Sequence, residues 1–240
     1  MHTGLIALWV LVVVLIVYGV CLAARAAYVC RSDPRKQKYG CPRCLPLVSE
    51  GFAHKMEGLV HRYTDVMRRE GIDSWATAGT LLGIVRGIGH MPWDDDADFA
   101  IRASDLERFQ QINWAHYGLK IRKLPMSLQV YEKWYDGRWV DVFVYEPDPR
   151  DPSMWQFQNK AARKMWPKER FSHASLFPLR PAQFGSVSVL TPCNARDVAV
   201  ASYSHDAIGH VRVKPMHVWT AVDWPFVLAN GSFPLKEHDP

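Results

Sequence analysis

The chain has 240 residues, 48% of them hydrophobic, and a formal net charge of +5. This length supports one good hydrophobic core and argues against two sizeable domains, and the apolar content excludes a largely disordered chain. The charge gives no support to nucleic-acid binding, because six basic residues, offset by Asp33, supply the whole excess. The six are Arg25, Arg31, Arg35, Lys36, Lys38 and Arg43. We interpret them as a membrane-flanking cluster and expect no nucleic-acid partner.

An uncharged apolar segment runs from Leu5 to Ala24. About 20 such residues cross the hydrocarbon core of a bilayer as a helix, so we predict a membrane anchor at residues 1–25. A cleaved signal peptide is the alternative, with Ala24-Arg25-Ala26 as a weak cleavage-like site. The segment is longer than a usual signal core and lacks a basic start, which favours the retained anchor. The basic residues after it would, by the positive-inside rule, place the rest of the chain in the cytoplasm.

Residues 26–50 contain three prolines and mixed charge, and we interpret them as a basic stem before a folded domain at 51–240. Within the stem, Cys41 and Cys44 have the spacing of half a zinc site, but no second close pair follows. A disulfide framework that involves Cys30, Cys41, Cys44 and Cys193 is therefore the favoured interpretation. Zinc bound with the help of Cys30 or a distant ligand, and free thiols, remain alternatives.

Apolar residues spaced about 3.6 apart predict a helix at about 51–70 that ends near Gly71. Ser104 and Glu107 have the spacing of a capping box and predict a helix that ends at about Asn113, while Asp136-Gly137 predicts a hairpin turn. In chain order, the other predicted elements are a strand at 74–78, a short helix or turn at 81–86, strands at 118–123, 128–134 and 138–145, a loop at 147–152, a strand at 185–190 and a helix at 195–203. This order predicts an α+β fold.

Four carboxylates, those of Asp94, Asp95, Asp96 and Asp98, lie within five residues and repel one another. A fold that holds them close needs a compensating charge, and hard carboxylate oxygens favour magnesium, manganese or calcium. In a strand, Asp94, Asp96 and Asp98 would point to one side and offer two or three ligands to one ion. A solvated acidic turn is the alternative, which the apolar residues after Asp98 disfavour.

Asp141 lies in a strongly strand-like run from Trp139 to Tyr145, where a lone carboxylate is unfavourable unless something pairs with it. Beside the strand of Asp96 and Asp98, it would complete a three-carboxylate site. Such triads can bind two metal ions about 4 Å apart and stabilise the attacking and leaving oxygens of phosphoryl transfer. The alternative is a carboxylate on an edge strand that faces water.

Gly79 and Thr80 come shortly before the acidic stretch. Small residues at the start of a helix let backbone N–H groups approach a phosphate closely, although a Gly-Thr pair alone is usually only a turn. Arg86 follows within reach as a possible partner for the same anion. An ordinary surface arginine is the alternative.

These motifs together resemble the LicD family, which includes phosphocholine transferases of bacterial glycans and fukutin-type ribitol-phosphate transferases. The resemblance rests on Gly79-Thr-Leu-Leu-Gly-x-x-Arg86, on Pro92-Trp-Asp-x-Asp-x-Asp98 and on Val140-Asp-Val142, and it runs from about Tyr63 to Tyr203. It implies a nucleotidyltransferase-like fold, in which a small mixed sheet is flanked by helices and metal carboxylates lie on adjacent strands. The domain at 51–240 would then be a LicD-like catalytic domain.

The resemblance also implies transfer of a substituted phosphate from a CDP-activated donor to a glycan hydroxyl, with Mg²⁺ or Mn²⁺ as cofactor. The residues that match the family are Asp96, Asp98 and Asp141 as metal ligands and catalytic residues, Gly79 and Thr80 at the phosphate loop, Arg86 after it, and Asp94 in a supporting role. Asp141 is also a candidate to accept the proton of the attacking hydroxyl. The chain departs from the family at Tyr203-Ser204, where the family often has Tyr-Gly, and this puts the acceptor side in doubt more than the metal site.

Eukaryotic relatives of this kind are commonly type II Golgi proteins, which implies a lumenal catalytic domain and conflicts with the positive-inside rule. We give the resemblance more weight, because about four residues before the span offer little basis for charge counting.

Three other functions remain possible from the sequence. A glycosyltransferase could use its Asp-x-Asp motif to bind a nucleotide-sugar through manganese. A calcium-binding loop would match Asp94, Asp96 and Asp98, but Phe99 stands where the loop needs glycine and Asp105 replaces the bidentate glutamate. A catalytically silent scaffold is the third.

Overall fold

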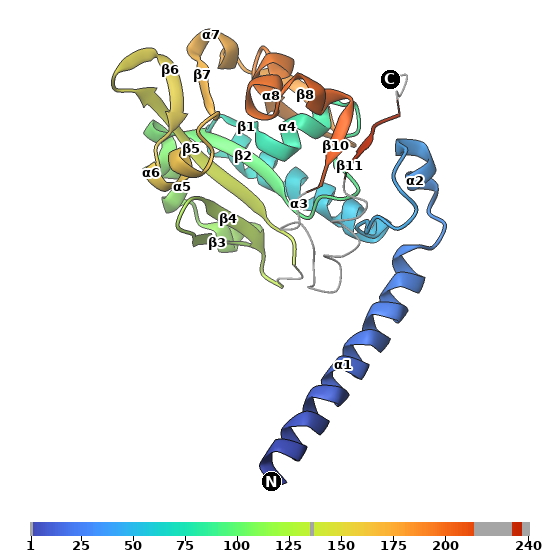
Figure 1. The fold of residues 1–240 in the computed structure, drawn as a ribbon. Helices are drawn as coiled ribbons and strands as arrows, with labels where there is room; N and C mark the ends of the chain where they lie inside the picture. The colour runs from blue at the N-terminus through green and yellow to red at the C-terminus, as the bar shows by residue number, and fades with distance from the viewer. Residues whose placement is uncertain (1, 135–136, 214–231, 237–240) are drawn as a thin grey trace. The chain divides into compact units, whose positions relative to one another are not determined.

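The computed structural model describes residues 2–134, 137–213 and 232–236 of the chain (Figure 1). It divides into two units: the N-terminal unit, which contains the described residues up to 47 and from 210 onwards, and the sheet unit, which contains residues 48–209. The helices are α1 (His2–Val29), α2 (Pro34–Tyr39), α3 (Glu50–Arg69), α4 (Ala78–Val85), α5 (Leu106–Gln111), α6 (Lys160–Met165), α7 (His173–Leu176) and α8 (Ala195–Tyr203), with 3-10 turns η1 (Ala103–Asp105), η2 (Trp114–Tyr117) and η3 (His205–Ile208).

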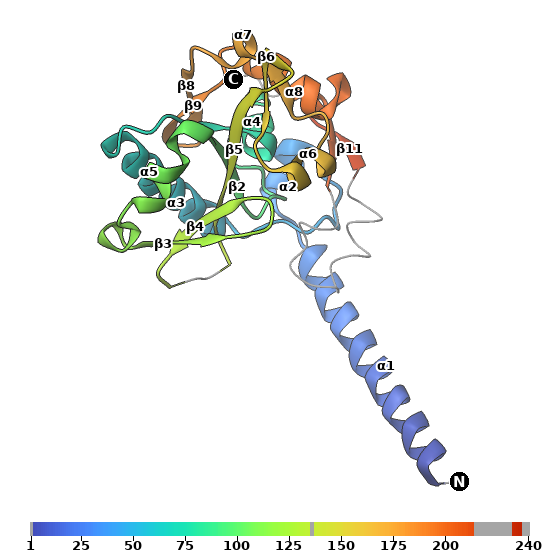
Figure 2. The same cartoon turned by 90° about the vertical axis from the view of Figure 1, so that its left-hand side faces the viewer.

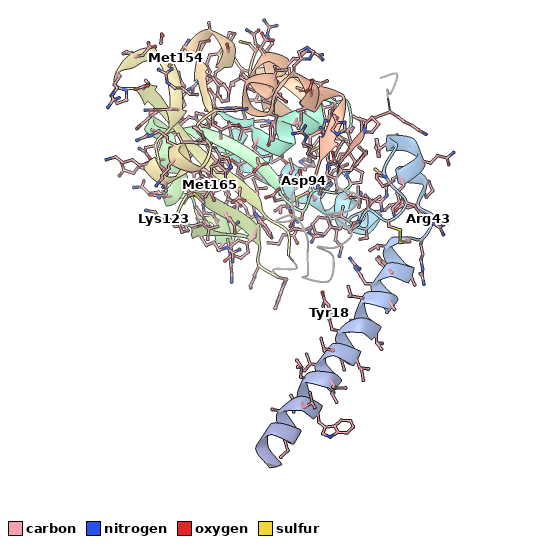
Figure 3. All side chains as sticks on the ribbon, viewed as in Figure 1. Tyr18, Arg43, Asp94, Lys123, Met154 and Met165 are labelled. Atoms are coloured by element: carbon pink, nitrogen blue, oxygen red, sulfur yellow. A yellow bond between two sulfur atoms is a disulfide. The ribbon has the colours of Figure 1, made fainter. Side chains whose placement is uncertain are left out.

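In the N-terminal unit, α1 contains a stretch, Ile6–Val29, that is long and apolar enough to cross a bilayer. Its described side chains project from the helix on all sides, Tyr18 among them (Figure 3). A signal sequence would satisfy the same criteria of length and composition. The helix therefore fits the predicted anchor without excluding a cleaved leader.

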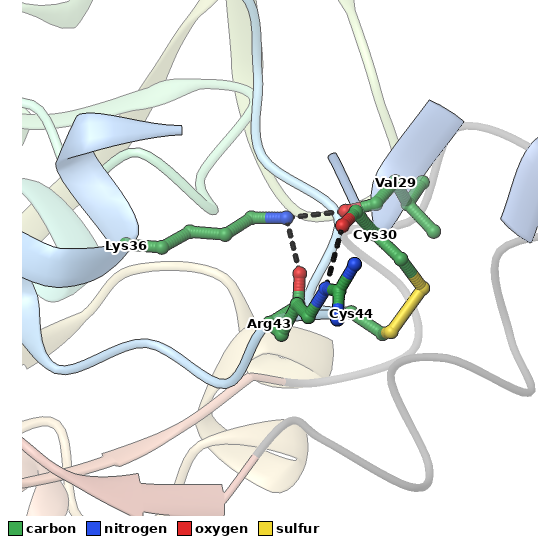
Figure 4. The surroundings of a disulfide bond; sticks show 5 residues. All are labelled: Val29, Cys30, Lys36, Arg43 and Cys44. Atoms are coloured by element: carbon green, nitrogen blue, oxygen red, sulfur yellow. Dashed lines mark hydrogen bonds between the residues drawn. A yellow bond between two sulfur atoms is a disulfide. The ribbon is translucent and has the colours of Figure 1, made fainter. Parts of the chain in front are cut away.

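A disulfide joins Cys30 to Cys44 and closes the stem (Figure 4). Inside this loop the buried Lys36 donates hydrogen bonds from Nζ to the carbonyl oxygens of Val29 and Arg43, the latter at 2.6 Å. The Arg43 side chain donates in turn to the Cys30 carbonyl at 3.1 Å. The favoured disulfide interpretation thus holds for one pair, and it bypasses Cys41.

The described residues of the sheet unit form one nine-stranded sheet, in which seven strands follow the order β3-β4-β5-β2-β1-β9-β8. The other two extend it beside β5: β6 pairs with the C-terminal half of β5, and β7 pairs with β6. The strands are β1 (Ser74–Ala76), β2 (Ala97–Arg102), β3 (Leu119–Lys123), β4 (Leu128–Glu132), β5 (Val140–Asp148), β6 (Asp151–Phe157), β7 (Arg170–Ser172), β8 (Arg180–Phe184) and β9 (Val187–Thr191); β10 (His210–Arg212) and β11 (Ser232–Pro234) pair in the N-terminal unit. The pairs β2–β5 and β1–β9 are parallel, and the other pairs are antiparallel. Figure 2 shows β5 and β2 at the centre of the sheet.

The two faces of this sheet are covered by different helices. Side chains alternate along each strand, so Phe99 packs on one face with α3 and α5, while Ala100 packs on the other with α4 and α8. The apolar period of α3 therefore buries Met56, Leu59 and Tyr63 completely. Because side chains alternate along a strand, Asp98 and Asp141 project to the same face of the sheet as Ala100. Both carboxylates therefore point toward α4.

Most predicted elements of the sheet unit are present, and the fold is α+β as expected. The helix predicted at 51–70 is α3, and Gly71 after it adopts φ +63°, the left-handed conformation that ends many helices. The helix predicted at 195–203 is α8, and strands lie where 118–123, 128–134 and 138–145 were predicted. β4 and β5 pair antiparallel, as a hairpin requires, but Asp136 of the predicted turn lies outside the described residues.

Two local predictions were wrong. The capping box of Ser104 and Glu107 does not form, because the chain enters α5 through the 3-10 turn η1 and neither start has a side-chain cap. The loop predicted at 147–152 is mostly strand, because β5 and β6 continue to pair until Asp148 meets Asp151. Backbone pairing across the hairpin overrides the turn propensity of its Pro and Asp residues.

Candidate active site

The site begins with two carboxylates on neighbouring parallel strands. Asp98 in β2 and Asp141 in β5 are direct partners in the register of the two strands, although their sequence separation is 43 residues. Because partners in a ladder project to the same face, their side chains lie next to each other. The register alone therefore brings the two carboxylates together.

Asp96 completes a cluster with these two residues. One carboxylate oxygen from each of Asp96, Asp98 and Asp141 lies within 4.8 Å of the others, and Asp96 forms a similar group with Asp94 and Asp95. The predicted strand geometry was wrong for part of this stretch, because β2 begins at Ala97 and residues 94–96 form the loop before it. The loop turns the carboxylates inward: Asp94 is only 6% exposed and lies inside the unit (Figure 3).

The cluster suits a divalent cation. Burial and the neighbouring carboxylates of Asp98 and Asp94 raise the pKa of Asp96 well above its usual value. A hard divalent cation would offset this repulsion, and carboxylate oxygens are the ligands that magnesium, manganese and calcium prefer. The residues present therefore fit a divalent metal ion.

The N-terminus of α4 lies directly against the carboxylates. The Gly79 amide donates to Oδ2 of Asp98 at 3.0 Å, and the Asp98 amide donates to the Thr80 hydroxyl at 2.7 Å. A Cβ at Gly79 would lie 2.9 Å from Oδ2 of Asp94, which is closer than real side chains pack. Ala78, just before it, holds φ +43°, an unfavourable conformation for a residue with a side chain. Glycine at 79 thus allows the helix start to approach the acidic cluster.

Asp141 is held by several neutral donors. Ser127 donates to its Oδ1 at 2.9 Å and the Trp139 indole to its Oδ2 at 2.9 Å. Burial raises the pKa of Asp141, whereas hydrogen bonds from Ser127, Trp139 and Gln129 lower it. These donors stabilise the ionised carboxylate and restrict its rotation.

Arg86 lies at the end of α4 and is directed toward the segment after α8. Its guanidinium donates to the Ala207 carbonyl at 2.6 and 3.0 Å and to the Met91 sulfur at 3.0 Å. Burial lowers the pKa of Arg86 to about 10, partly offset by Tyr203 and Asp94. The hydrogen bonds to Ala207 thus join the C-terminal end of α4 to the turn η3 after α8.

Tyr203 is a further residue at this site, and the sequence alone did not identify it. Burial and the charges of Asp98, Glu169, Asp94 and Asp96 raise the pKa of its phenol well above the usual value. Ser204, the next residue, holds φ +125°. The only sequence signal was the departure from Tyr-Gly, and the backbone angle explains why glycine is favoured there.

Residues 71–194 match the family model described as LicD/FKTN/FKRP, nucleotidyltransferase domain. The chain belongs to this family. Members named among its relatives are transferases of substituted phosphates, which supports the resemblance drawn from the Pro-Trp-Asp motif.

Individual relatives are distant in sequence. An uncharacterised protein of Rickettsia prowazekii is 28% identical over 73% of this chain and 61% of its own length. The human ribitol-5-phosphate transferase FKTN is 25% identical over 78% of this chain and 40% of its own. The lipopolysaccharide cholinephosphotransferase LicD of Haemophilus influenzae is 28% identical over 39% of this chain and 42% of its own. The chain thus spans roughly half the length of such relatives.

Among solved structures, the lincosamide adenylyltransferase LnuA bound to lincomycin aligns with a TM-score of 0.41 and 11% identity, over 76% of this chain and 96% of that one. A likeness at this level carries no functional conclusion.

Proposed function

We propose that the chain transfers a substituted phosphate, such as phosphocholine or ribitol phosphate, from a CDP-activated donor to a glycan hydroxyl, with Mg²⁺ or Mn²⁺ as cofactor. The observation that carries this proposal is the convergence of Asp96, Asp98 and Asp141 within 4.8 Å, beside the N-terminus of α4. Family membership supports it, because FKTN and LicD carry the names of a ribitol-5-phosphate transferase and a cholinephosphotransferase.

In this reaction the acceptor oxygen attacks the phosphorus that bears the substituent, the bond to the bridging oxygen breaks, and CMP leaves. Asp96, Asp98 and Asp141 would hold the metal ion, which neutralises charge on the donor pyrophosphate. The N–H groups at the start of α4, at Gly79 and Thr80, form dipoles that favour an anion. The Asp94 carboxylate packs directly against Gly79. Arg86 supports the site by fixing the end of α4 against Ala207.

The hydroxyl proton must leave during the attack. Asp141 is the candidate acceptor from the sequence. Burial raises the pKa of its carboxyl group although the hydrogen bonds that it receives act in the opposite direction, and a raised pKa favours proton acceptance. We therefore keep Asp141 as the proposed acceptor.

The test uses the full-length chain in detergent with CDP-choline, CDP-ribitol and CDP-glycerol, and measures CMP release with added Mn²⁺ or with chelator. We expect metal-dependent release with one donor, reduced roughly 10³-fold or more by Asp96→Asn combined with Asp98→Asn. Asp105→Asn is the matched control, because this carboxylate pairs with Arg108 at 3.3 Å and not with the cluster. An undiminished rate in the double variant would end the assignment.

A metal-dependent glycosyltransferase is distinguished by its released nucleotide. UDP or GDP set free from a nucleotide-sugar, with no CMP from any CDP donor, would favour that alternative. The Gly79–Asp98 hydrogen bond and the third carboxylate in β5 support phosphotransfer instead.

We also propose that α1 is a retained anchor and that the residues after it face an oxidising lumen, such as that of the Golgi or ER. The Cys30–Cys44 disulfide supports this, because such bonds persist in oxidising compartments and are rare in the cytosol. The basic residues after the span favour the opposite orientation, but a disulfide depends on compartment more directly than a charge bias does.

A further inference from the structure

A row of polar side chains crosses the sheet beside the acidic cluster. In the strand register Arg122 of β3 is the partner of Gln129 in β4, Gln129 is the partner of Asp141 in β5, and Asp141 is the partner of Asp98 in β2. Partners in a ladder project to one face, so the four side chains form a continuous line. This line connects an exposed arginine to the candidate metal ligands.

The Gln129 amide has a defined orientation within this row. Arg122 donates from Nε to the Gln129 oxygen Oε1 at 2.7 Å, and an arginine has no acceptor with which to bind the NH₂ group instead. The Gln129 NH₂ group is thereby left to the side of Asp141, its partner in the strand register, where donation to the carboxylate lowers the pKa of Asp141. Gln129 is 4% exposed, so water does not compete effectively for these bonds.

We propose that Gln129, oriented by Arg122, is a positioning residue that fixes the Asp141 carboxylate as a metal ligand. The inference rests on the metal site of the proposed function and extends it to the β3–β4 hairpin. Carboxylate ligands held by outer hydrogen bonds lose less entropy on binding a metal, and loss of such a partner typically reduces metal affinity by roughly 10–100-fold.

The direction in which metal affinity changes when Arg122 is removed distinguishes a positioning role from a purely electrostatic one. Arg122 is a cation near a cation site, so if it acted only through its charge, its removal would strengthen metal binding. If it acts through Gln129, its removal weakens metal binding, because the amide can then rotate and present its oxygen to Asp141. Lys120 lies two residues earlier on the same face of β3, where its register partner is Tyr131 and not Gln129. Lys120→Met, which removes one positive charge, is therefore the matched control.

The experiment measures Mn²⁺ affinity of the full-length chain in detergent, by the paramagnetic resonance signal of free Mn²⁺. We expect Gln129→Met to weaken binding about 10-fold or more, Arg122→Met to weaken it severalfold, and Lys120→Met to leave it unchanged or slightly tighter. Combined with Gln129→Met, Arg122→Met should add nothing further, because the two act as one unit. Arg122 is exposed, so its variant tests the proposal even if Gln129→Met folds poorly.

Unchanged or tighter Mn²⁺ binding in Arg122→Met overturns the proposal, as does unchanged binding in a folded Gln129→Met variant. Additive losses in the double variant also overturn it, because they would assign separate effects to the two residues. If the wild-type chain binds no Mn²⁺, the metal site of the proposed function fails together with this inference. Binding by the wild type with no change in the variants leaves the metal site intact and removes only the positioning role.

Discussion

The disulfide-closed stem and the acidic site both take charged groups out of water, but they balance the charge differently. In the stem, the buried Lys36 ammonium donates to backbone carbonyls of Val29 and Arg43 (Figure 4). In the acidic site, burial and the neighbouring carboxylates raise the pKa of Asp96 well above its usual value. The stem thus satisfies its charge with its own backbone, whereas the acidic site favours an added cation. The first arrangement serves stability, and the second serves binding.

Backbone strain also differs between the stem and the acidic site. Among the described residues, the two that hold positive φ without being glycine are Ala78, which precedes Gly79 at the acidic site, and Ser204, which follows Tyr203. The left-handed position in the stem is occupied by Gly40, which adopts it without a steric penalty. Strain of this kind persists where the surrounding structure imposes it, and it is concentrated at functional sites.

The largest expected effect concerns the stem. Cys30→Ser opens a loop with a sequence separation of 14 residues, which should reduce the stability of the stem by about 3 kcal/mol. Hydrogen exchange of the stem amides should therefore accelerate, while β2 and β5 stay protected. Cys193→Ser, which removes a free thiol, is the control. Equal protection of the stem in both variants would show that the disulfide has no structural role.

A smaller effect with the opposite sign is expected at the acidic site. The folded state raises the pKa of Asp96, so the stability that this group contributes is present below its unfolded pKa and is lost as pH rises through the folded value. In chelator at pH 8, Asp96→Asn should therefore raise Tm by about 3 °C, the shift that about 1 kcal/mol produces in a domain of this size.

Two further measurements sharpen this prediction. The gain from Asp96→Asn should shrink near pH 3, below the unfolded pKa, where the wild-type group is mostly protonated in both states, and Mn²⁺ should stabilise the wild type more than the variant. A lower Tm for the variant in chelator at pH 8 would mean that groups of the chain itself already stabilise the ionised carboxylates, as the backbone carbonyls stabilise the Lys36 ammonium in the stem.

The smallest effect tests the strain beside the site. Ser204→Gly relieves the φ of +125° but adds freedom to the unfolded chain, so we expect a net gain of roughly 0.5 kcal/mol in the free energy of unfolding. Ser202→Gly, inside α8, should destabilise by a similar amount because glycine is a poor helix former. Denaturant titration measures both. A loss of stability in Ser204→Gly would mean that the serine makes a contact that outweighs its strain.

The sequence by itself predicted the elements with a strong period, such as α3 and α8, because side chains that repeat every 3.6 residues report one buried face. It missed β6 and β8, whose short runs have mixed composition and form only because a neighbouring strand offers its backbone. The disulfide was expected, but its partners were not, since pairing depends on which cysteines the fold brings together.

For the site, the sequence determined which residue types are available: the acidic stretch, the small pair Gly79-Thr80 and a lone carboxylate in an apolar strand. Only the tertiary structure decided that Asp98 and Asp141 are partners, because the parallel register of β2 and β5 is set by packing across the whole sheet. It also directed Arg86 to the Ala207 carbonyl and brought Tyr203 to the cluster. The chemistry of a single residue is local and can be read from the chain, whereas contacts between distant residues exist only once the sheet and the helices on its two faces have packed together.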